Sequence, residues 1–344
     1  MLPQVRAASL TNYVEVARFC GLDPYAMLKR ARINPAILTD ADDPVAADAV
    51  GRLLEASARE SGCDAFGLLM AESRSVASLG AVGLLLKYQG TARDVIEAIV
   101  RYQVLMGDAL VLAIEEAGGT TTIRTDIDTG IGGHQGLDLL MGFACRTISA
   151  AVSGRWRPES AHFVYPRPDD LSVHCRVFQC PLVFESGYNG LVCPTAWLDA
   201  PNPDAESVMA RHAQRYLDAL LPAPADGSVA ARARRSLYLL LPAGRATVEQ
   251  AADNLGLHAR TLQRLLEKEE RTFATVLNEV RRELALRYLS SSAHSVTQIA
   301  QMTGYASASS FTRWFVAEFG MSPAAWRAEE RAEAEDGLLP LMRA

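Results

Sequence analysis

The chain has 344 residues, of which 49% are apolar and 22% charged, and its formal net charge is −6. This length suits two or three domains that each bury a core without disulfides or structural metals. No apolar run approaches the roughly 20 residues that span a bilayer, and the N-terminus lacks a basic-then-apolar leader. We therefore expect a cytoplasmic protein with no membrane partner.

Helical periodicity opens the chain. Apolar residues recur at a spacing near 3.6 over residues 10–19, ending with Phe19 before Gly21, and again over residues 45–61. Thr91 is placed to cap a third helix, which carries its apolar residues on one face. These patterns predict an N-terminal body that begins with helices.

Strand signals follow the third helix. Residues 110–115 and 120–127 alternate around Gly118-Gly119, which is typical of a hairpin. A further helix is predicted over 137–152, and short strands over 162–165 and 182–185. The N-terminal body is therefore expected to be an α+β domain and not a pure β-barrel.

Six cysteines occur, and none forms a Cys-x-x-Cys pair. The densest group combines His174 with Cys175, Cys180 and Cys193, which leaves a metal-binding or redox role open. The spacing of this group matches no zinc pattern. We favour small buried apolar cysteines, and we expect no metal site and no cofactor.

A linker is predicted at 222–228, where the sequence reads Pro-Ala-Pro-Ala-Asp-Gly-Ser. It separates an N-terminal domain, 1–221, from a C-terminal domain, 229–328, and a tail, 329–344. Residues 229–328 contain 13 basic and 8 acidic residues, a balance of +5, whereas the rest of the chain sums to −11. A basic segment on an acidic body indicates that one part of the chain meets phosphates.

The C-terminal domain contains an internal repeat. Residues 248–252 (Val-Glu-Gln-Ala-Ala) return 48 positions later as 296–300 (Val-Thr-Gln-Ile-Ala), and Gly256-Leu257 returns as Gly304-Tyr305. Each copy predicts a short helix, a glycine-centred turn and a second helix, at about 248–267 and 296–317. We therefore expect an all-α domain with two helix-turn-helix units.

The second helix of each copy leaves polar residues on its outer face. These are Arg260, Gln263 and Arg264 in the first copy and Ser309, Ser310, Thr312 and Arg313 in the second. Arginine pairs with guanine and glutamine with adenine through two hydrogen bonds each, and hydroxyls reach bases or phosphates. The alternative is a helical bundle with a merely polar surface, which the duplication disfavours. We interpret these residues as contacts to double-stranded DNA.

A single helix is predicted over 273–289, between the two copies. It would hold both reading helices on one side of a duplex, whose successive major grooves lie about 34 Å apart. Arg281, Arg282 and Arg287 add positive charge to it. Contact with phosphates and pairing inside the domain, to Glu279 or Glu283, both stay open.

The C-terminal domain resembles the DNA-binding domain of the AraC/XylS family of regulators. The matching stretches are 262–266 (Leu-Gln-Arg-Leu-Leu), 280–285 (Val-Arg-Arg-Glu-Leu-Ala), 299–300 with 304–305, 310–315 (Ser-Phe-Thr-Arg-Trp-Phe), 320–323 and 326–327. The resemblance implies a module of seven helices whose base-reading residues fall on the outward positions named above. The sequence departs from the family at His258, where a serine N-cap is usual, and at Val316 and Ala317, which are often basic in relatives.

The N-terminal body resembles the effector domain of ornithine-type and virulence-type AraC regulators, not the sugar-binding cupin type. The resemblance rests on 21–24 (Gly-Leu-Asp-Pro), 34–38 (Asn-Pro-Ala-Ile-Leu), 53–56 (Leu-Leu-Glu-Ala), 66–68 (Phe-Gly-Leu) and 101–102 (Arg-Tyr). It implies a domain that binds a small-molecule effector of unknown identity and pairs subunits in a homodimer. RNA polymerase is a further expected partner.

Five residues are candidate effector contacts: Tyr88, Arg101, Tyr102, His134 and Trp156. Ligand pockets combine apolar walls with a few convergent polar groups, although a lone aromatic residue at helical spacing is more often core. Residues 134–136 (His-Gln-Gly), which open a helix, are also hypothesised to offer amide donors to an anion.

The predicted function is a sequence-specific, DNA-binding transcription regulator controlled by a small-molecule effector. An alternative is an effector-independent regulator whose N-terminal domain serves dimerisation or partner contact. A third class, an enzyme with an attached DNA-binding module, is disfavoured by the lack of a zinc-held cysteine cluster, a Walker loop, a Gly-x-Ser-x-Gly elbow and a His-Glu-x-x-His motif. We expect no catalytic residues.

Overall fold

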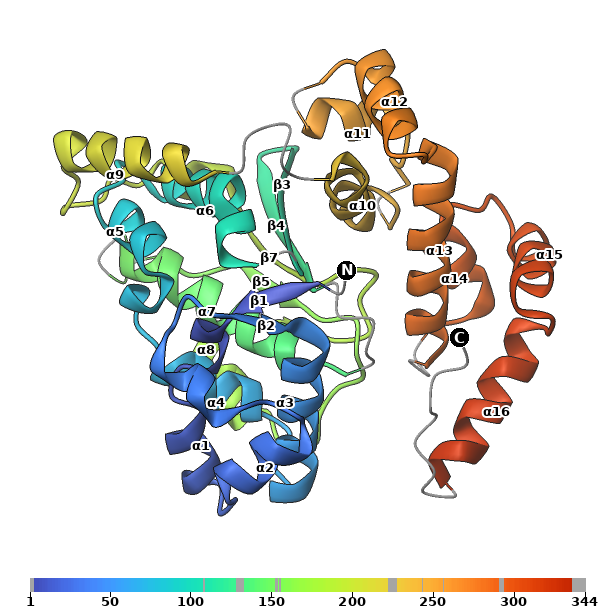
Figure 1. Cartoon of the computed structure of the whole chain (residues 1–344), viewed down its shortest axis with the longest axis horizontal. Coiled ribbons are helices and arrows are strands. Elements are labelled where there is room, and N and C mark those ends of the chain that lie inside the picture. The colour runs from blue at the N-terminus through green and yellow to red at the C-terminus, as the bar shows by residue number, and fades with distance from the viewer. Residues whose placement is uncertain are drawn as a thin grey trace. The chain divides into compact units, whose positions relative to one another are not determined.

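A computed structural model of the chain describes residues 3–107, 109–127, 133–151, 154, 156–221, 228–242, 244–255, 257–290 and 294–335. The chain divides into two compact units, Met1–Ala223 and Pro224–Ala344 (Figure 1). Among the described residues, every helix is too short or too polar to cross a membrane.

The first unit is built from nine α-helices among the described residues, four short 3-10 helices and two sheets. The α-helices are α1 (Tyr13–Phe19), α2 (Pro24–Arg30), α3 (Ala47–Ser61), α4 (Phe66–Ser73), α5 (Ala81–Lys87), α6 (Ala92–Met106), α7 (Gln135–Ala151), α8 (Ser172–Phe178) and α9 (Ser207–Leu220). The 3-10 helices are η1 (Ala7–Leu10), η2 (Pro35–Thr39), η3 (Val76–Leu79) and η4 (Thr195–Asp199). The α+β class predicted for this part of the chain is confirmed.

Two sheets complete the first unit. Strands β1 (Gln4–Arg6) and β2 (Pro44–Ala46) form an antiparallel pair. The larger sheet has five strands in the order β3-β4-β7-β5-β6, comprising β3 (Leu110–Ala117), β4 (Thr120–Ile127), β5 (Ser160–His162), β6 (Leu182–Val183) and β7 (Gly190–Pro194). The hairpin prediction is confirmed, because β3 and β4 are antiparallel and Gly118 and Gly119 turn with φ of +59° and +82°.

Three local predictions are wrong. The helix expected over 10–19 is split, because η1 ends before Thr11 and Asn12, the N-cap of α1, has a left-handed backbone with φ of +62°. Phe19 lies off the buried side of α1, and its side chain is 81% exposed. The strand expected over 162–165 stops at His162, and the amide of Val164 donates to Oδ1 of Asn189 at 2.8 Å instead of to a strand.

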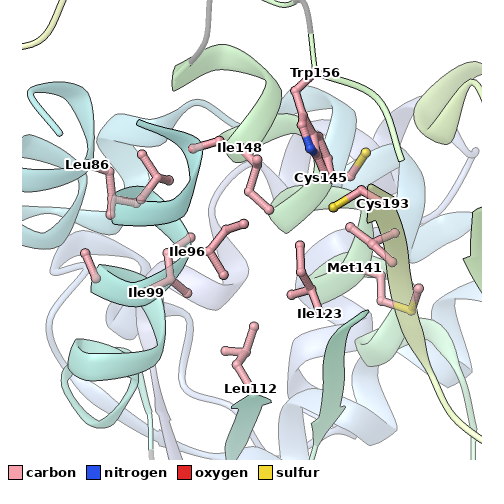
Figure 2. Close-up of a cluster of buried hydrophobic side chains, with 14 of the residues drawn as sticks. Leu86, Ile96, Ile99, Leu112, Ile123, Met141, Cys145, Ile148, Trp156 and Cys193 are labelled. Atoms are coloured by element: carbon pink, nitrogen blue, oxygen red, sulfur yellow. The ribbon is translucent and has the colours of Figure 1, made fainter. Parts of the chain in front are cut away.

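Helix α7 links the two buried cores of the first unit. Leu137, Met141 and Cys145 belong to a core shared with α5, α6 and the large sheet, whereas Leu139 belongs to the core formed with α1–α4. Figure 2 shows the first of these cores, with Ile96 and Ile99 facing Leu112 and Ile123 of the hairpin. Burial of both flanks fixes α7 between the helical and the sheet-bearing parts of the unit.

The described part of the second unit consists of seven helices, as the family resemblance implies. They are α10 (Val229–Leu240), α11 (Val248–Asn254), α12 (Ala259–Lys268), α13 (Phe273–Ser290), α14 (Val296–Met302), α15 (Ala308–Phe319) and α16 (Pro323–Glu335). The long helix predicted between the repeats is α13, whose 18 residues make it about 27 Å long. Figure 1 shows α13 running between the pair α11–α12 and the pair α14–α15.

Candidate nucleic-acid interface and ligand cavity

The first helix-turn-helix unit is α11 followed by α12. Thr247 caps α11 by accepting a hydrogen bond from the amide of Gln250 at 3.2 Å. The small, fully buried Ala251 and Ala252 let α12 pack closely through Leu262 and Leu266. Gly256, which the repeat placed at the turn, lies outside the described residues.

The outer face of α12 carries the predicted base-reading residues. Arg260, Gln263 and Arg264 are all exposed, and their spacing of three and four places them on one side of the helix. Within the described residues, neither arginine makes an ion pair or a hydrogen bond. His258 occupies the N-cap position of α12 with no side-chain capping bond, so the predicted departure from the family has a structural counterpart.

The second unit of the repeat is α14 followed by α15. Ser295 and Gln298 form a capping box at the start of α14, and Gly304 turns the chain with φ of +76°. Ser307 caps α15 by accepting from the amide of Ser310 at 3.2 Å. The side chains of Phe311 and Phe315 are fully buried on the inner side of α15.

The four predicted contacts on α15 differ in their availability. Ser309 and Arg313 are exposed, and Arg313 makes neither an ion pair nor a hydrogen bond within the described residues. Thr312 and Ser310 are half-buried, and Oγ of Ser310 lies 3.0 Å from Oγ of Ser307 in the cap. Ser309 and Arg313 are therefore the residues of this helix best placed for an external partner.

Two arginines of α13 pair inside the unit. Nε of Arg281 donates to the carbonyl of Thr303 at 3.2 Å, and Arg282 lies 3.2 Å from Glu318 of α15. Pairing within the domain was one of the two alternatives for these residues. The partners of Arg281 and Arg282 differ from the predicted Glu279 and Glu283, since Glu279 pairs with Arg271 and Glu283 with Arg234.

The candidate effector contacts of the first unit do not gather into one site. The hydroxyl of Tyr102 donates to Asp218 at 2.7 Å, and Arg101 contacts the same carboxylate at 2.9 Å, which joins α6 to α9. Trp156 is buried in the core near Cys145 and Cys193 (Figure 2). Tyr88 is half-buried at the end of α5, under the ammonium of Lys87.

His134 belongs to a separate polar cluster at the start of α7. Its ring stacks on Tyr165, with centroids 4.2 Å apart. Tyr165 donates to the buried Asp138 and lies 3.1 Å from Nε2 of His174. Burial raises the pKa of Asp138 well above its usual value and lowers the pKa of His174 to about 4.

The hypothesised anion site at the start of α7 is occupied from within the chain. The amide of Gln135 donates to Oε1 of Glu55 at 2.7 Å, so a carboxylate of α3 receives the helix N-terminus. Burial raises the pKa of Glu55 despite these hydrogen bonds. The backbone amides of His134 and Gln135 are therefore engaged by Glu55 within the fold.

A cavity of about 130 Å³ lies within the first unit, between its two cores. Residues of β1, η1, α3, η3, α6, β3, β4 and α7 line it, together with Arg74, which follows α4. None of the five candidate effector contacts lines this cavity. The sequence analysis did not single out Arg74 or Thr147, which are among the polar residues of the lining together with Arg6, Ser9 and Ser78.

The cysteine-rich segment does not form a metal site in the described part of the chain, where no three potential ligands converge. Cys193 is buried in the core, Cys180 is half-buried and Cys175 is exposed. Burial raises the pKa of both Cys180 and Cys193 to about 11, which keeps these thiols protonated and unreactive at neutral pH.

Tandem helix-turn-helix units joined to an α+β domain define a DNA-binding transcription regulator. Residues 21–202 match the family described as the arabinose-binding domain of AraC transcription regulators, and residues 251–329 match a helix-turn-helix domain family. The first match spans more than half of the chain. The protein belongs to the AraC family of transcription regulators, with a ligand-binding type of domain at its N-terminus.

The relatives share both parts of the chain. The chain is similar to the HTH-type transcriptional regulator VirS of Mycobacterium tuberculosis, with 29% identity over 328 residues, covering 94% of this chain and 96% of VirS. It is 25% identical to the ornithine utilization regulator of Pseudomonas aeruginosa, covering 89% of this chain and 91% of the relative. The crystal structure of the transcriptional regulator CdpR from Pseudomonas aeruginosa aligns with a TM-score of 0.40 at 20% identity, covering 88% of this chain and 96% of CdpR. These relatives are regulators, not enzymes.

Proposed function

We propose that this regulator reads a specific operator in double-stranded DNA with the outer faces of α12 and α15. The proposal rests on which arginines of the second unit are exposed and unpaired and which are engaged inside it. Arg260, Arg264 and Arg313 are exposed and make no ion pair or hydrogen bond within the described residues, whereas Arg271, Arg281 and Arg282 are engaged inside the unit. Free cations on recognition helices are what phosphates and guanine edges attract.

The two helices would divide the readout unequally. The outer face of α12 offers two arginines and a glutamine, which suit guanine and adenine in the major groove. The outer face of α15 offers one arginine with Ser309 and Thr312, which suit phosphates or a single base. We propose that α12 contributes more to sequence choice.

The test is binding of the full-length protein to DNA fragments from its own upstream region at two salt concentrations. We expect selective binding that weakens steeply as salt rises, because each neutralised phosphate releases counterions. Binding that is equal on all fragments, or insensitive to salt, would contradict the proposed readout. An Arg260→Ala/Arg264→Ala/Arg313→Ala variant should lose selective binding and keep the thermal stability of the wild type.

We propose further that a small-molecule effector, bound in the domain formed by residues 1–221, controls the DNA-binding domain at 229–328. The predicted linker between them, 222–228, lies outside the described residues except for Ser228. The cavity of the first unit supports effector control. The alternative, an N-terminal domain that serves only dimerisation, is supported by α9, which leaves Val208, Tyr216 and Leu220 exposed by 50%, 59% and 48%.

Light scattering of the purified protein separates these roles. If the α9 face joins a homodimer, Tyr216→Glu should yield monomers at concentrations where the wild type dimerises. A melting temperature that rises with an effector in both proteins would show that effector binding does not require the pairing face of α9. The proposal includes RNA polymerase as the partner at a promoter, the cytoplasm as the site of action, and no catalytic activity.

A further inference from the structure

We propose that the cavity of the first unit binds a small apolar monocarboxylate, with the ligand's carboxylate on the guanidinium of Arg74. This inference rests on the proposed effector function and names the chemical class of the effector. It is carried by the walls of the cavity, by the unpaired charge of Arg74 and by two buried hydroxyls without partners.

The walls of the cavity are almost wholly apolar. Val50 and Leu54 of α3, Ile99 of α6, Leu112 of β3 and Phe143 of α7 are among the residues that line it. Its volume of about 130 Å³ is close to the roughly 150 Å³ of an engineered apolar cavity that binds benzene. The space therefore suits one aromatic ring or a short branched or linear alkyl chain.

Arg74 brings a positive charge to this apolar space without an acidic partner. Its Nη2 donates to the carbonyl of Ala8 at 3.0 Å and to that of Ser9, and its Cζ lies 5.8 Å from the ring centroid of Phe143. Within the described residues, no carboxylate forms an ion pair with Arg74, and its buried Nε has no hydrogen-bond partner. Arg6, the other arginine of the lining, differs because it is ion-paired with Asp42.

The side chain of Arg74 remains a cation at neutral pH. Burial lowers the pKa of its guanidinium to about 10, which is still well above neutrality. A partly desolvated cation attracts an anion more strongly than an exposed one, because less water screens the pair. A carboxylate bound here would supply the counter-charge that the protein itself does not.

Two hydroxyls of the lining add hydrogen-bond donors. Oγ of Ser9 and Oγ1 of Thr147 are buried and have no hydrogen-bond partner within the described residues. The carbonyl of Ser9 already accepts from Arg74, and Thr147 lies one helical turn after Phe143 on α7, so both residues adjoin the contacts of the guanidinium. Buried polar groups are seldom left unpaired, which indicates that a ligand completes this set.

The same lining disfavours other ligand classes. It contains no aspartate or glutamate, so the ammonium group of an amino acid would be buried without a counter-charge. It also offers too few donors and acceptors for the hydroxyls of a sugar. An uncharged apolar body with one anionic end is the chemistry that matches the cavity.

The experiment is titration calorimetry of the full-length protein with phenylacetate and hexanoate, each compared with its primary amide and with ornithine. We expect both acids to bind, and the amides and ornithine to bind at least about tenfold more weakly. Arg74→Gln should weaken binding of the acids by about tenfold or more and leave binding of the amides unchanged. Arg176→Gln, which removes an exposed arginine paired with Glu72, is the matched control and should bind like the wild type.

Thr147→Val keeps the shape of the side chain and removes only its hydroxyl, so it provides a second test if Arg74→Gln does not fold. It should weaken binding of the acids by roughly threefold to tenfold. Equal affinity for acid and amide, or wild-type affinity in both variants, would overturn the proposal. The titration contains no DNA, so absence of acid binding in a protein that still selects its operator would overturn the ligand class alone.

Discussion

His174 makes the stability of the first unit depend on pH. The residue is fully buried, and the rings of Phe163 and Phe184 pack against it. Because burial lowers the pKa of its imidazole to about 4, the folded chain keeps it neutral at mildly acidic pH, where the unfolded chain binds a proton. Stability contributed by this residue is therefore present above about pH 6.5 and is lost as the pH falls toward 4.

We expect the free energy of unfolding to fall by about 2 kcal/mol between about pH 7 and pH 5 through His174 alone. The buried Asp138 opposes this trend, because its raised pKa makes the folded state bind a proton first. Urea denaturation of the wild type and of His174→Gln at both pH values isolates the histidine. The same pH dependence in both proteins would show that His174 does not titrate as described.

Arg264 is the residue on which sequence choice by α12 should depend most directly. Removing it should weaken operator binding by about 1–3 kcal/mol and relax the preference at one base pair. Arg271→Ala is the control, since that arginine is already paired with Glu279. Competition binding against single-base operator variants provides the measurement, and an unchanged preference at every position would remove the assigned role.

At the level of single residues, the sequence predicts which side of a helix a residue faces but not which distant residue it contacts. The repeat alone identified the outward positions of α12, because helical spacing decides which side a residue faces. It could not reveal that Asp218, more than 100 positions away, engages both Arg101 and Tyr102. Nor did any local pattern mark Arg74, whose importance arises only from the absence of an acid around it in the fold.

The start of α12 offers a test at the level of a whole helix. His258 has the extended backbone of an N-cap, with φ of −81° and ψ of 147°, but its side chain makes no capping bond. A serine hydroxyl at this position can accept from the free amides of the first turn. We expect His258→Ser to stabilise the protein by about 0.5–1 kcal/mol in urea denaturation and His258→Ala to give no gain.

Elements differed in how well the sequence predicted them. Helices α3, α6, α7 and α13 followed from their long periodic patterns, and the β3–β4 hairpin followed from its glycine turn. The strand β7 was not predicted, β5 lies N-terminal to its predicted position, and β6 begins where predicted but ends two residues earlier, because strands of two to five residues carry too little alternation to be recognised. Their positions are set by pairing with distant strands and by the side chain of Asn189.

At the scale of the whole molecule, effector and operator binding should be linked. A ligand changes DNA affinity only if it binds two states of the protein unequally, and the same factor must then appear in both directions. We expect phenylacetate to change the dissociation constant of the operator. Operator DNA should then change the dissociation constant of phenylacetate by the same ratio. Fluorescence titrations in both orders measure the two ratios. Tight binding of both ligands without any mutual effect would exclude this control.

The cavity could not be predicted from the sequence, because it forms only when distant parts of the first unit come together. Its walls come from eight elements and from Arg74, spread from β1 to α7, so no short stretch of sequence encodes it. The two helix-turn-helix units of the second unit could be predicted from the sequence, because the helices of each unit are neighbours in sequence. The ligand-binding part could be predicted only as a class.

The duplicated units give the operator a direction. Regulators built as symmetric dimers bind sites that read alike on both strands, because a twofold axis relates their two reading helices. Here α12 and α15 follow one another on a single chain, and their outer faces differ in arginine content. A single chain therefore binds an operator and its inverted copy in opposite orientations. Each protein chain that binds through the proposed faces of α12 and α15 therefore has a defined orientation along the DNA, set by the orientation of its site.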